Sequence, residues 1–548
     1  MVRLEWAGKD KVVNHHKDVP FRKLDRIYSY DKDGEHAEDN GSENMIVHGD
    51  NLEALKALLP KYEGKVKCVY IDPPYNTGNE GWIYNDNMTD PFFKKWLGDV
   101  VGKEGEDFSR HDKWLCMMYP RLVLLKKLLR EDGAIFISID DNEIGYLRMV
   151  MDEIFGTKHF IAQISLLCNP KGRSQDKYFA TNHEYLLVYS KGYLEPGSFS
   201  VEKDPEQIEK QYKLSDEKGK YRLLNLRNTH REFGKHNRPN LWYPFYVNPD
   251  DGSVSLDRDE SHTVEVLPLW DDGFEGCWTW DRNRSTSMLD MIASGKTKAG
   301  KWNIFRKNYG ETGEDIVRTK LFTIWSNPKF YTEKGQAVFG QIFPGASKED
   351  FPQPKSVQYI EEVVRCFTHD DDIILDSFAG SGTTGHAVLN VNSDGGDRRF
   401  ILLEKMNYAN PITAERIKRV IQGYGDVPGI DSSFSFYELG EPYLIDGDLN
   451  PSLDLETIRG YIFYMETKQP YIRQEYPNPA MLGRVGDTAY YLLYGEDVPT
   501  QLDDSFITCL DRDSTNHVVY ADSDYMSERN HREYNIRFAK IPRDVRGH

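Results

Sequence analysis

Short apolar runs alternate with stretches of helical spacing over two parts of the chain. Leu122, Leu125, Leu128 and Leu129 share one face of a 3.6-residue period, which predicts a long helix. Apolar runs bounded by turn residues predict strands. The expected strands are 45–48, 66–71, 134–139, 160–167, 184–189, 373–375 and 399–403. The expected helices are 51–59, 111–130, 142–155, 355–367, 383–389 and 414–422.

This alternation predicts an α/β fold with a doubly wound, mostly parallel, Rossmann-like sheet. It stops near Lys191 and resumes after residue 345, so we expect one sheet domain split by a long insertion. The stretch between is irregular and rich in Asn, Asp, Gly and Trp, and a small α+β region follows from about residue 441. The predicted domains are 1–190 and 346–440 (two halves of the sheet domain), 191–345 (insertion) and 441–548 (C-terminal region).

The length of 548 residues also predicts several domains. Because no N-terminal stretch resembles a signal peptide and no apolar run approaches membrane length, we expect a soluble, cytoplasmic protein without membrane contact. The six cysteines are scattered without a Cys-x-x-Cys pair. We therefore expect reduced thiols and no metal site.

The formal charge of −19 argues at first sight against a nucleic-acid ligand. However, residues 191–345 hold 23 basic and 23 acidic side chains, and residues 281–330 hold 10 basic and 5 acidic ones. DNA binding needs a local basic face rather than a basic protein. This stretch is therefore the candidate nucleic-acid interface, although the same charges fit an ordinary solvated surface.

Residues Asp72-Pro73-Pro74-Tyr75 follow the apolar run 66–71 and carry the most informative chemistry. Asp72 and the Pro73 carbonyl can accept both hydrogens of an aromatic amine, which draws its nitrogen toward tetrahedral geometry. The two prolines restrict the backbone and pre-organise the loop. Tyr75 can stack on a flat heterocycle. If the amine belongs to a base in duplex DNA, that base must be flipped out to reach this loop.

A glycine-rich turn, Asp376 to Gly382, follows a second apolar strand. Gly380 and Gly382 allow the backbone to approach a ligand closely. Glu404 ends the next strand, at a spacing that suits a carboxylate binding ribose hydroxyls of an adenosine. Alone, such a loop also fits a dinucleotide cofactor, but the lysine of a phosphate-binding P-loop is missing.

With both loops present, the sequence resembles the amino-methylating DNA methyltransferases. The catalytic motif precedes the cofactor motif with a long insertion between them, an order similar to the β class. Further stretches resemble the modification (Mod) subunit of Type III restriction–modification systems. They are Tyr75-Asn76-Thr77-Gly78, residues 84–87, 114–129 and 133–141, and His183-Glu184-Tyr185.

The resemblance implies S-adenosylmethionine as cofactor and assigns roles to matching positions. The catalytic residues would be Asp72, Pro73, Pro74 and Tyr75. The cofactor-binding residues would be Asp50, Lys355, Asp376, Phe378, Gly380, Gly382 and Glu404. Asp50 would accept from the cofactor adenine and Lys355 would pair with the methionine carboxylate. Ser356 replaces the second proline of the usual Pro-Lys-Pro pattern. The alternative interpretation of Asp50 is a helix cap, and that of Lys355 is a solvated lysine.

The resemblance also makes the insertion a target-recognition region for double-stranded DNA. The C-terminal region would then serve dimerisation or contact with a restriction (Res) subunit or another defence-system protein, and a homodimer is expected. The DNA-binding candidates are Arg282, Arg284, Lys296, Lys298, Lys301, Arg306 and Lys307.

The implied activity is transfer of a methyl group to the N6 amine of a flipped-out adenine in a specific sequence. One alternative is cytosine-N4 methylation, which is more often associated with Ser in place of Asp72. Another is a non-catalytic, cofactor-bound DNA-recognition subunit, against which intact Asp72 and Tyr75 argue.

Overall fold

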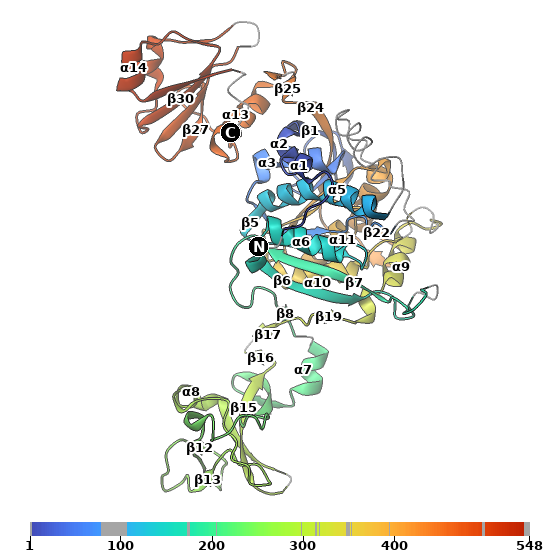
Figure 1. Ribbon diagram of the computed structural model, residues 1–548, viewed down its shortest axis with the longest axis vertical. Helices are drawn as coiled ribbons and strands as arrows, with labels where there is room; N and C mark the ends of the chain where they lie inside the picture. Colours follow the sequence, from blue (N-terminus) through green and yellow to red (C-terminus); the bar gives the residue numbers. More distant parts are fainter. Residues whose placement is uncertain are drawn as a thin grey trace. The chain divides into compact units, whose positions relative to one another are not determined.

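The computed structural model divides the chain into two compact units. Unit 1 comprises Met1–Ser198 with Phe322–His548, and unit 2 comprises Phe199–Leu321 (Figure 1). The structure describes residues 3–77, 107–172, 176–203, 205–297, 299–312, 315–316, 318–346, 351, 353–393, 395–445, 447–495 and 499–541.

An eleven-stranded sheet forms the centre of unit 1. Its six central strands, from β5 to β24, all run parallel, and antiparallel pairs flank them on both sides. The expectation of a mostly parallel, doubly wound sheet is confirmed. The strand order is β19 (Ile324–Trp325), β6 (Phe160–Leu167), β7 (His183–Ser190), β5 (Leu129–Ile139), β4 (Val66–Ile71), β20 (Ile373–Asp376), β21 (Arg399–Glu404), β3 (Met45–His48), β24 (Phe434–Pro442), β1 (Arg22–Asp31) and β2 (Gly34–His36).

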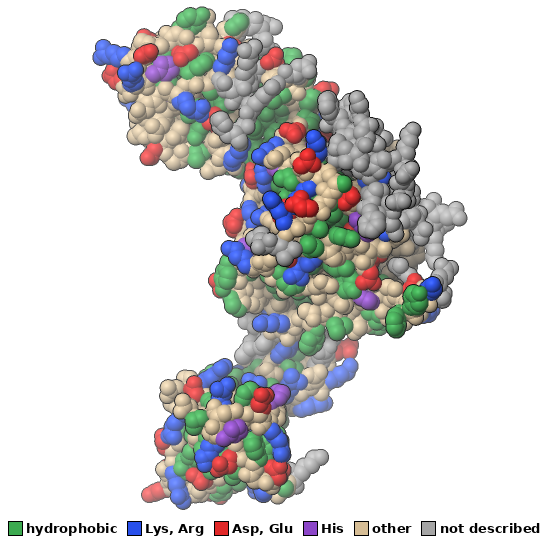
Figure 2. Space-filling model, viewed as in Figure 1, with side chains coloured by type: hydrophobic (Ala, Val, Ile, Leu, Met, Phe, Trp, Pro, Cys, Tyr) green, Lys and Arg blue, Asp and Glu red, His purple; other side chains and the backbone are tan. Residues whose placement is uncertain are grey.

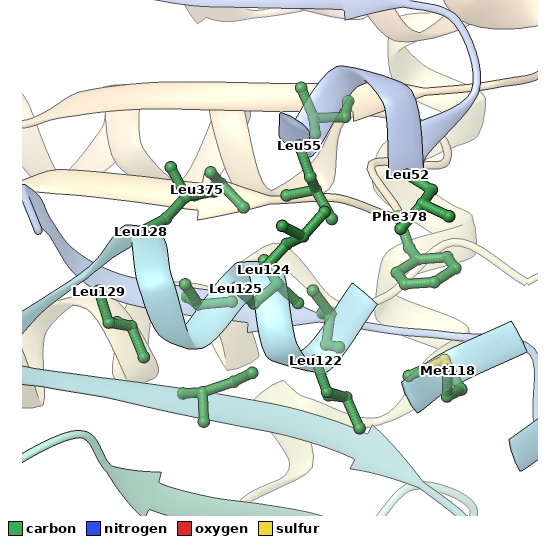
Figure 3. Close-up of a cluster of buried hydrophobic side chains, with 14 of the residues drawn as sticks. Leu52, Leu55, Met118, Leu122, Leu124, Leu125, Leu128, Leu129, Leu375 and Phe378 are labelled. Atoms are coloured by element: carbon green, nitrogen blue, oxygen red, sulfur yellow. The ribbon is translucent and has the colours of Figure 1, made fainter. Parts of the chain in front are cut away.

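Helices cover both faces of this sheet. Successive side chains of a strand point to opposite faces, so a strand that is buried along its whole length, such as β4, needs cover on both sides. On β4, Val69 and Ile71 join the cluster that contains α3 (Asn51–Tyr62), α5 (Asp107–Leu128) and α6 (Ile144–Ile154). Figure 3 shows the leucines of α5 in this cluster with Leu52 and Leu55 of α3 and Leu375 of β20. Such a buried apolar face stabilises each helix on the sheet.

The opposite face of the sheet receives α10 (Val357–Phe367), with α11 (Thr383–Asn392) and α12 (Glu415–Gln422) following later in the chain. Tyr70 of β4 contacts Tyr359 of α10 edge-to-face at 6.0 Å, and Phe136 of β5 contacts Phe367 at 5.8 Å. The Ser138 hydroxyl joins both tyrosine hydroxyls, at 2.9 Å from Tyr70 and 3.0 Å from Tyr359. These contacts fix the start of α10 beside the end of β4.

Several expected boundaries differ from the structure. The helix expected over 111–130 ends at Leu128, because Leu129 pairs with Val66 and already belongs to β5. The helix expected from 142 begins at Ile144, and the one expected from 355 begins at Val357. Lys355 therefore lies in the loop before α10. Strands β1 and β24 were not predicted, because charged residues interrupt their apolar positions.

Unit 2 contains more regular structure than the irregular stretch expected from the sequence. Its four-stranded antiparallel sheet has the order β14 (Ile292–Lys296), β15 (Trp302–Tyr309), β10 (Gly219–Asn225) and β9 (Leu214–Asp216). A core around Phe245, Trp278 and Ile304 packs against it. The unit is shorter than the expected insertion 191–345, because α9 (Thr332–Ile342) belongs to unit 1.

The chain enters and leaves unit 2 through a short paired stem. Strand β8 (Val201–Glu202) pairs antiparallel with β18 (Arg318–Thr319), and the Arg318 side chain donates to the backbone carbonyl of Ser200 and to its hydroxyl. The two ends of this long segment are thus held together within unit 2.

The C-terminal region contributes helices α13 (Leu455–Thr467) and α14 (Glu528–Glu533) and a small sheet to unit 1. Strands β28 (Thr488–Leu492), β30 (Asn516–Ala521) and β32 (Ile536–Lys540) run parallel, and β27 (Met481–Val485) pairs antiparallel. Among the described residues, no helix has the length and apolar character needed to cross a bilayer.

Candidate functional site

The site is built where four neighbouring parallel strands end at the same edge of the sheet. In the register, Val69 of β4 lies beside Leu375 of β20, Asp376 beside Leu402 of β21, and Glu404 beside His48 of β3. Residues that directly follow these strands therefore share one edge, where ligands bind in open α/β sheets.

The Asp72–Tyr75 loop is fixed from behind by helix α5. The indole nitrogen of Trp114 donates to the Pro74 carbonyl oxygen at 2.7 Å. Asn76 adopts a left-handed conformation (φ 58°), and its amide donates to the buried carboxylate of Glu143. His111 holds the same carboxylate oxygen at 2.6 Å. These contacts hold the chain at Pro74 and Asn76 and so restrict the loop before any ligand binds.

Tyr75 is the centre of a polar network that sequence reasoning missed. Its hydroxyl donates to Glu184 at 3.0 Å and accepts from the Lys355 ammonium at 2.7 Å. Lys355 also bonds both carboxylate oxygens of Glu184, each at 2.9 Å, and lies 3.3 Å from Asp72 Oδ1. The solvated-lysine alternative for Lys355 is therefore wrong, since the structure surrounds this cation with two carboxylates.

The charges in this network change one another's proton affinity. Burial raises the pKa of Asp72, the Lys355 cation opposes that rise, and the Glu184 carboxylate reinforces it. Burial alone would lower the pKa of Lys355, but Asp72 and Glu184 outweigh it and hold this pKa above its usual value. Lys355 therefore stays charged between the two acids.

The glycine-rich turn has the backbone that its sequence demands. Gly380 and Gly382 have φ values of 53° and 80°, a region that favours glycine. A Cβ on Gly382 would lie 2.9 Å from the Thr413 carbonyl oxygen, whereas one on Gly380 would meet the ring of Phe351 at 3.2 Å. Thr413 also donates its hydroxyl to the Gly380 carbonyl at 2.6 Å. The turn is thus closely packed on one side.

Two buried carboxylates flank this turn. Asp376 accepts from the Phe378 amide at 2.9 Å and from the Thr384 hydroxyl at 2.5 Å. Glu404, 1% exposed, accepts from the Gly380 amide at 2.7 Å and from the Met406 amide at 2.9 Å. Burial raises the pKa of both carboxyls to about 7. Glu404 therefore lies directly against the glycine backbone, and its expected binding of ribose hydroxyls stays a prediction.

The two loops follow adjacent strands, β4 and β20, at the same edge of the sheet. The Asp72 carboxylate contributes to the raised pKa of Asp376, after burial as the main cause. Asn51, at the start of α3, donates to the Ser377 carbonyl at 3.2 Å and thereby ties the glycine-rich turn to the segment after β3. Segments far apart in the sequence are joined at one edge of one sheet.

Asp50 acts as a helix cap in this structure. Its Oδ1 accepts from the Leu52 amide at 2.9 Å and the Glu53 amide at 3.4 Å, at the N-terminus of α3. Its Oδ2 lies 3.1 Å from the Lys405 ammonium. The capping alternative is therefore correct, and acceptance from a cofactor adenine stays a prediction.

A buried arginine supports the glycine-rich turn, and sequence reasoning missed it too. Arg416 of α12 is fully buried and donates to the hydroxyls of Ser381 and Thr383, both at 2.8 Å. Burial lowers its pKa to about 10. Arg416 lies on the apolar face of α12, with Ile417, Val420 and Ile421. A basic residue among these apolar positions was the sequence signal that could have indicated a buried arginine.

The DNA-binding candidates all lie in unit 2, and six of them fall on described residues; Lys298 lies outside these. Arg284 stacks on Trp280 at 4.9 Å and Lys296 on Trp302 at 5.0 Å, and both are exposed at their charged ends. Lys301 is exposed in the turn before β15. On the face shown in Figure 2, basic and acidic side chains are interspersed over unit 2.

Two of the other three candidates form ion pairs within the protein, and the third lies on a strand face that packs toward the core. Lys307 bonds Asp216 at 2.7 Å, and Arg282 bonds Asp257 at 2.8 Å. Arg306 follows Ile304 on the same face of β15, toward the core of unit 2. Lys307 and Arg282 could therefore contact DNA phosphates only if these ion pairs were broken or shared.

No cluster of three metal-binding side chains occurs among the described residues, and the six cysteines are free thiols. The stretch at residues 84–87 and Gly78 of the family resemblance lie outside the described part of the chain.

The chain is similar to known proteins of one family. The family N6_N4_Mtase, described as DNA methylase, matches residues 66–415. The Type III restriction-modification enzyme EcoPI Mod subunit of Escherichia phage P1 is 34% identical over 426 residues, which cover 74% of this chain and 64% of that protein. The Type II methyltransferase M.KpnI of Klebsiella pneumoniae is 34% identical over 380 residues, covering 69% and 84%. The chain thus spans less than two thirds of the length of the EcoPI Mod subunit.

Among solved structures, the M1.HpyAVI–SAM complex matches 68% of this chain and 98% of its own, with 15% sequence identity and a TM-score of 0.29.

Proposed function

The chain belongs to the DNA methylase family, and from this premise we propose that it transfers a methyl group from S-adenosylmethionine to the N6 amine of adenine in a specific duplex sequence. The observation that carries the proposal is the shared sheet edge of the Asp72–Tyr75 loop and the Gly380 turn. At this edge, the loop proposed to bind the base and the turn proposed to bind the cofactor follow the adjacent strands β4 and β20.

The residues around the glycine-rich turn fit S-adenosylmethionine, which supplies an electrophilic methyl group when bound. A glycine with positive φ leaves the backbone at Gly380 open to close approach. The Glu404 carboxylate accepts from the Gly380 and Met406 amides beside this turn, and a carboxylate at this position suits the ribose hydroxyls of an adenosine. Phe378, buried at the same turn, adds an apolar wall.

The catalytic loop would position the target amine. Asp72 and the Pro73 carbonyl accept its two hydrogens, which localises the nitrogen lone pair for attack. The Tyr75 ring stacks on the flipped base, since its hydroxyl is already used by Glu184 and Lys355. No base is needed before attack, because the amine proton becomes acidic once the nitrogen is methylated. Asp72 is then the nearest acceptor for that proton.

Adenine is the favoured target. Aspartate at position 72, rather than serine, favours adenine over the N4 amine of cytosine. The matched relatives include Type III Mod subunits, and we propose the same substrate class for this chain. A non-catalytic role is disfavoured, because a pure recognition subunit has no need of a fixed Asp72–Tyr75 loop.

Unit 2 is proposed as the target-recognition region, with the candidates on α8 (Arg282–Ser287), β14 and β15 facing DNA. We further propose action in the cytoplasm within a restriction–modification system, with a Res subunit as partner of the C-terminal region. A homodimer remains a prediction.

The test is a transfer assay with a labelled methyl donor on mixed-sequence DNA, followed by digestion to nucleosides. The expected product is labelled N6-methyl-2′-deoxyadenosine with wild type and none with Asp72→Ala. Label in N4-methyl-2′-deoxycytidine would support the cytosine alternative. Equal labelling by Asp72→Ala would overturn the catalytic assignment, and an absence of label with wild type, despite cofactor binding, would support a recognition subunit.

A further inference from the structure

Glu184 has no role in the catalytic scheme above, yet it is the residue most closely tied to Tyr75. It lies at the start of β7, only 8% exposed, and receives hydrogen bonds from the Tyr75 hydroxyl and the Lys355 ammonium. Lys355 reaches the same point from the loop before α10. Strand β7 and the loop before α10 thus both contact the catalytic loop at Tyr75.

We propose that Glu184 and Lys355 form a clamp, the Glu184–Lys355 clamp, that fixes the Tyr75 ring and keeps Asp72 available as a hydrogen-bond acceptor. Both are positioning residues for methyl transfer, and this inference rests on the proposed function.

The first part of the clamp concerns the ring of Tyr75. A phenol hydroxyl has one proton, which goes to Glu184, and it accepts the Lys355 proton on its oxygen. Because both bonds end on the phenol oxygen, any swing of the side chain that displaces this oxygen would lose two charge-assisted hydrogen bonds. A stacking surface for a flipped base is therefore held in place before the base arrives.

The second part concerns the charge on Asp72. Lys355 lies between two acids, 3.3 Å from Asp72 and 2.9 Å from Glu184. Without Glu184, the ammonium would turn wholly to Asp72 and occupy the oxygen that should accept from the substrate amine. Without Lys355, two carboxylates would face each other, and one would take up a proton. An acceptor carboxylate that remains free and ionised needs both partners.

This balance makes a specific prediction for pH dependence. Replacing Glu184 by Gln removes a negative charge that raises the pKa of Asp72, and replacing Lys355 by Met removes a positive charge that lowers it. The acid limb of the kcat profile should move to lower pH in Glu184→Gln and to higher pH in Lys355→Met. The groups facing Asp72 are Lys355, Glu184, Tyr75, Tyr70 of β4, Tyr359 of α10 and Asp376 of β20.

The experiment measures kcat, KM for DNA and cofactor affinity against pH for wild type, Glu184→Gln, Lys355→Met and Tyr75→Phe. We expect kcat to fall by about 10- to 100-fold in each variant through misplacement of the loop. Glu184→Gln should leave cofactor affinity unchanged. The exposed Glu195 provides the matched control, and Glu195→Gln should behave as wild type. Opposite shifts of the acid limb support the clamp, whereas limbs that stay in place overturn it.

A second measurement does not depend on activity. The amine of Lys355 should react slowly with an acylating ester in the wild-type protein, because the two carboxylates keep it protonated. Mass spectrometry should find faster labelling of Lys355 in Glu184→Gln and in Asp72→Asn, with the exposed Lys301 as internal reference. Equal labelling in all variants would overturn the clamp even if the methyl-transfer proposal holds. If wild type transfers no methyl group while Lys355 is protected as expected, only the proposed function fails.

Discussion

The Trp114 indole and the Pro74 carbonyl share a hydrogen bond of 2.7 Å that joins helix α5 to the catalytic loop. Trp114 is fully buried, so Trp114→Phe leaves the carbonyl without this donor in a position closed to water. We expect a loss of about 1–3 kcal/mol in unfolding free energy. We also expect kcat to fall by about 10- to 100-fold, because the loop can shift.

Denaturant unfolding and single-turnover methyl transfer check this prediction for Trp114. The control is Trp302→Phe in unit 2, which should leave the chemical step unchanged. A Trp114→Phe protein with lower stability but a normal chemical step would show that Trp114 supports folding alone.

The two glycines of the cofactor turn should respond differently to alanine. At Gly382 a Cβ would lie 2.9 Å from a backbone oxygen at φ 80°, so Gly382→Ala should destabilise the fold by about 1–3 kcal/mol. At Gly380 the positive φ also strains alanine, but the near atom belongs to a side chain, so Gly380→Ala should cost less stability than Gly382→Ala and should weaken cofactor affinity. Thermal unfolding and calorimetric titration with S-adenosylmethionine separate the two effects. Gly340→Ala, where nothing lies within 4 Å, should be neutral or slightly stabilising.

Asp50 allows its two roles to be separated by one substitution. Serine also caps helices, so Asp50→Ser should retain most of the stability of α3. If Asp50 also accepts from the adenine of the cofactor, affinity for S-adenosylmethionine should fall by about tenfold or more, as for one lost charge-assisted hydrogen bond. Calorimetric titration measures it. Unchanged affinity together with unchanged stability would leave Asp50 as a cap only.

Glu404 should give the empty protein a pH-dependent stability. Its folded pKa of about 7 lies above the ordinary value of 4.5, so its contribution is fully present below pH 4.5 and is lost as pH rises through 7. The effect is on the order of 3 kcal/mol for a shift of this size. Denaturant unfolding between pH 5 and 8 should therefore show a steeper decline in wild type than in Glu404→Gln. Parallel curves for the two proteins would contradict the raised pKa.

The basic residues of unit 2 should differ in their share of DNA binding. Lys301 is exposed, whereas Lys307 is bonded to Asp216. We expect Lys301→Ala to reduce the slope of log affinity against log salt by about 1, and Lys307→Ala to reduce it less while lowering stability. Fluorescence anisotropy on duplex DNA at several salt concentrations measures both slopes. A larger change in slope for Lys307→Ala would reverse this ranking.

The sequence predicted the sheet better than anything outside it. Strands 45–48 and 66–71 match the structure to the residue, because buried parallel strands are continuous apolar runs with clear turn signals at both ends. The strands of unit 2 are short and antiparallel, with polar residues between their few core positions. Their alternation is too brief to stand out, and so the region looked irregular.

In the site, too, features that depend on local sequence were predicted and features that depend on distant contacts were not. Motif residues such as Asp72 and Gly380 were found because their chemistry depends on local spacing. Glu184, Lys405 and Arg416 act through contacts with residues more than 30 positions away, and no local pattern carries such contacts. The capping role of Asp50 was a stated alternative, since a carboxylate before a helix is a local signal.

The paired stem of β8 and β18 has an evolutionary consequence. A segment whose two ends meet in one short ladder joins the remainder of the chain at two nearby junctions. Recombination at those junctions could exchange the whole segment while the polypeptide on either side kept its register. With unit 2 as the proposed target-recognition region, a lineage would acquire a new DNA target in a single genetic event, with its chemistry inherited intact.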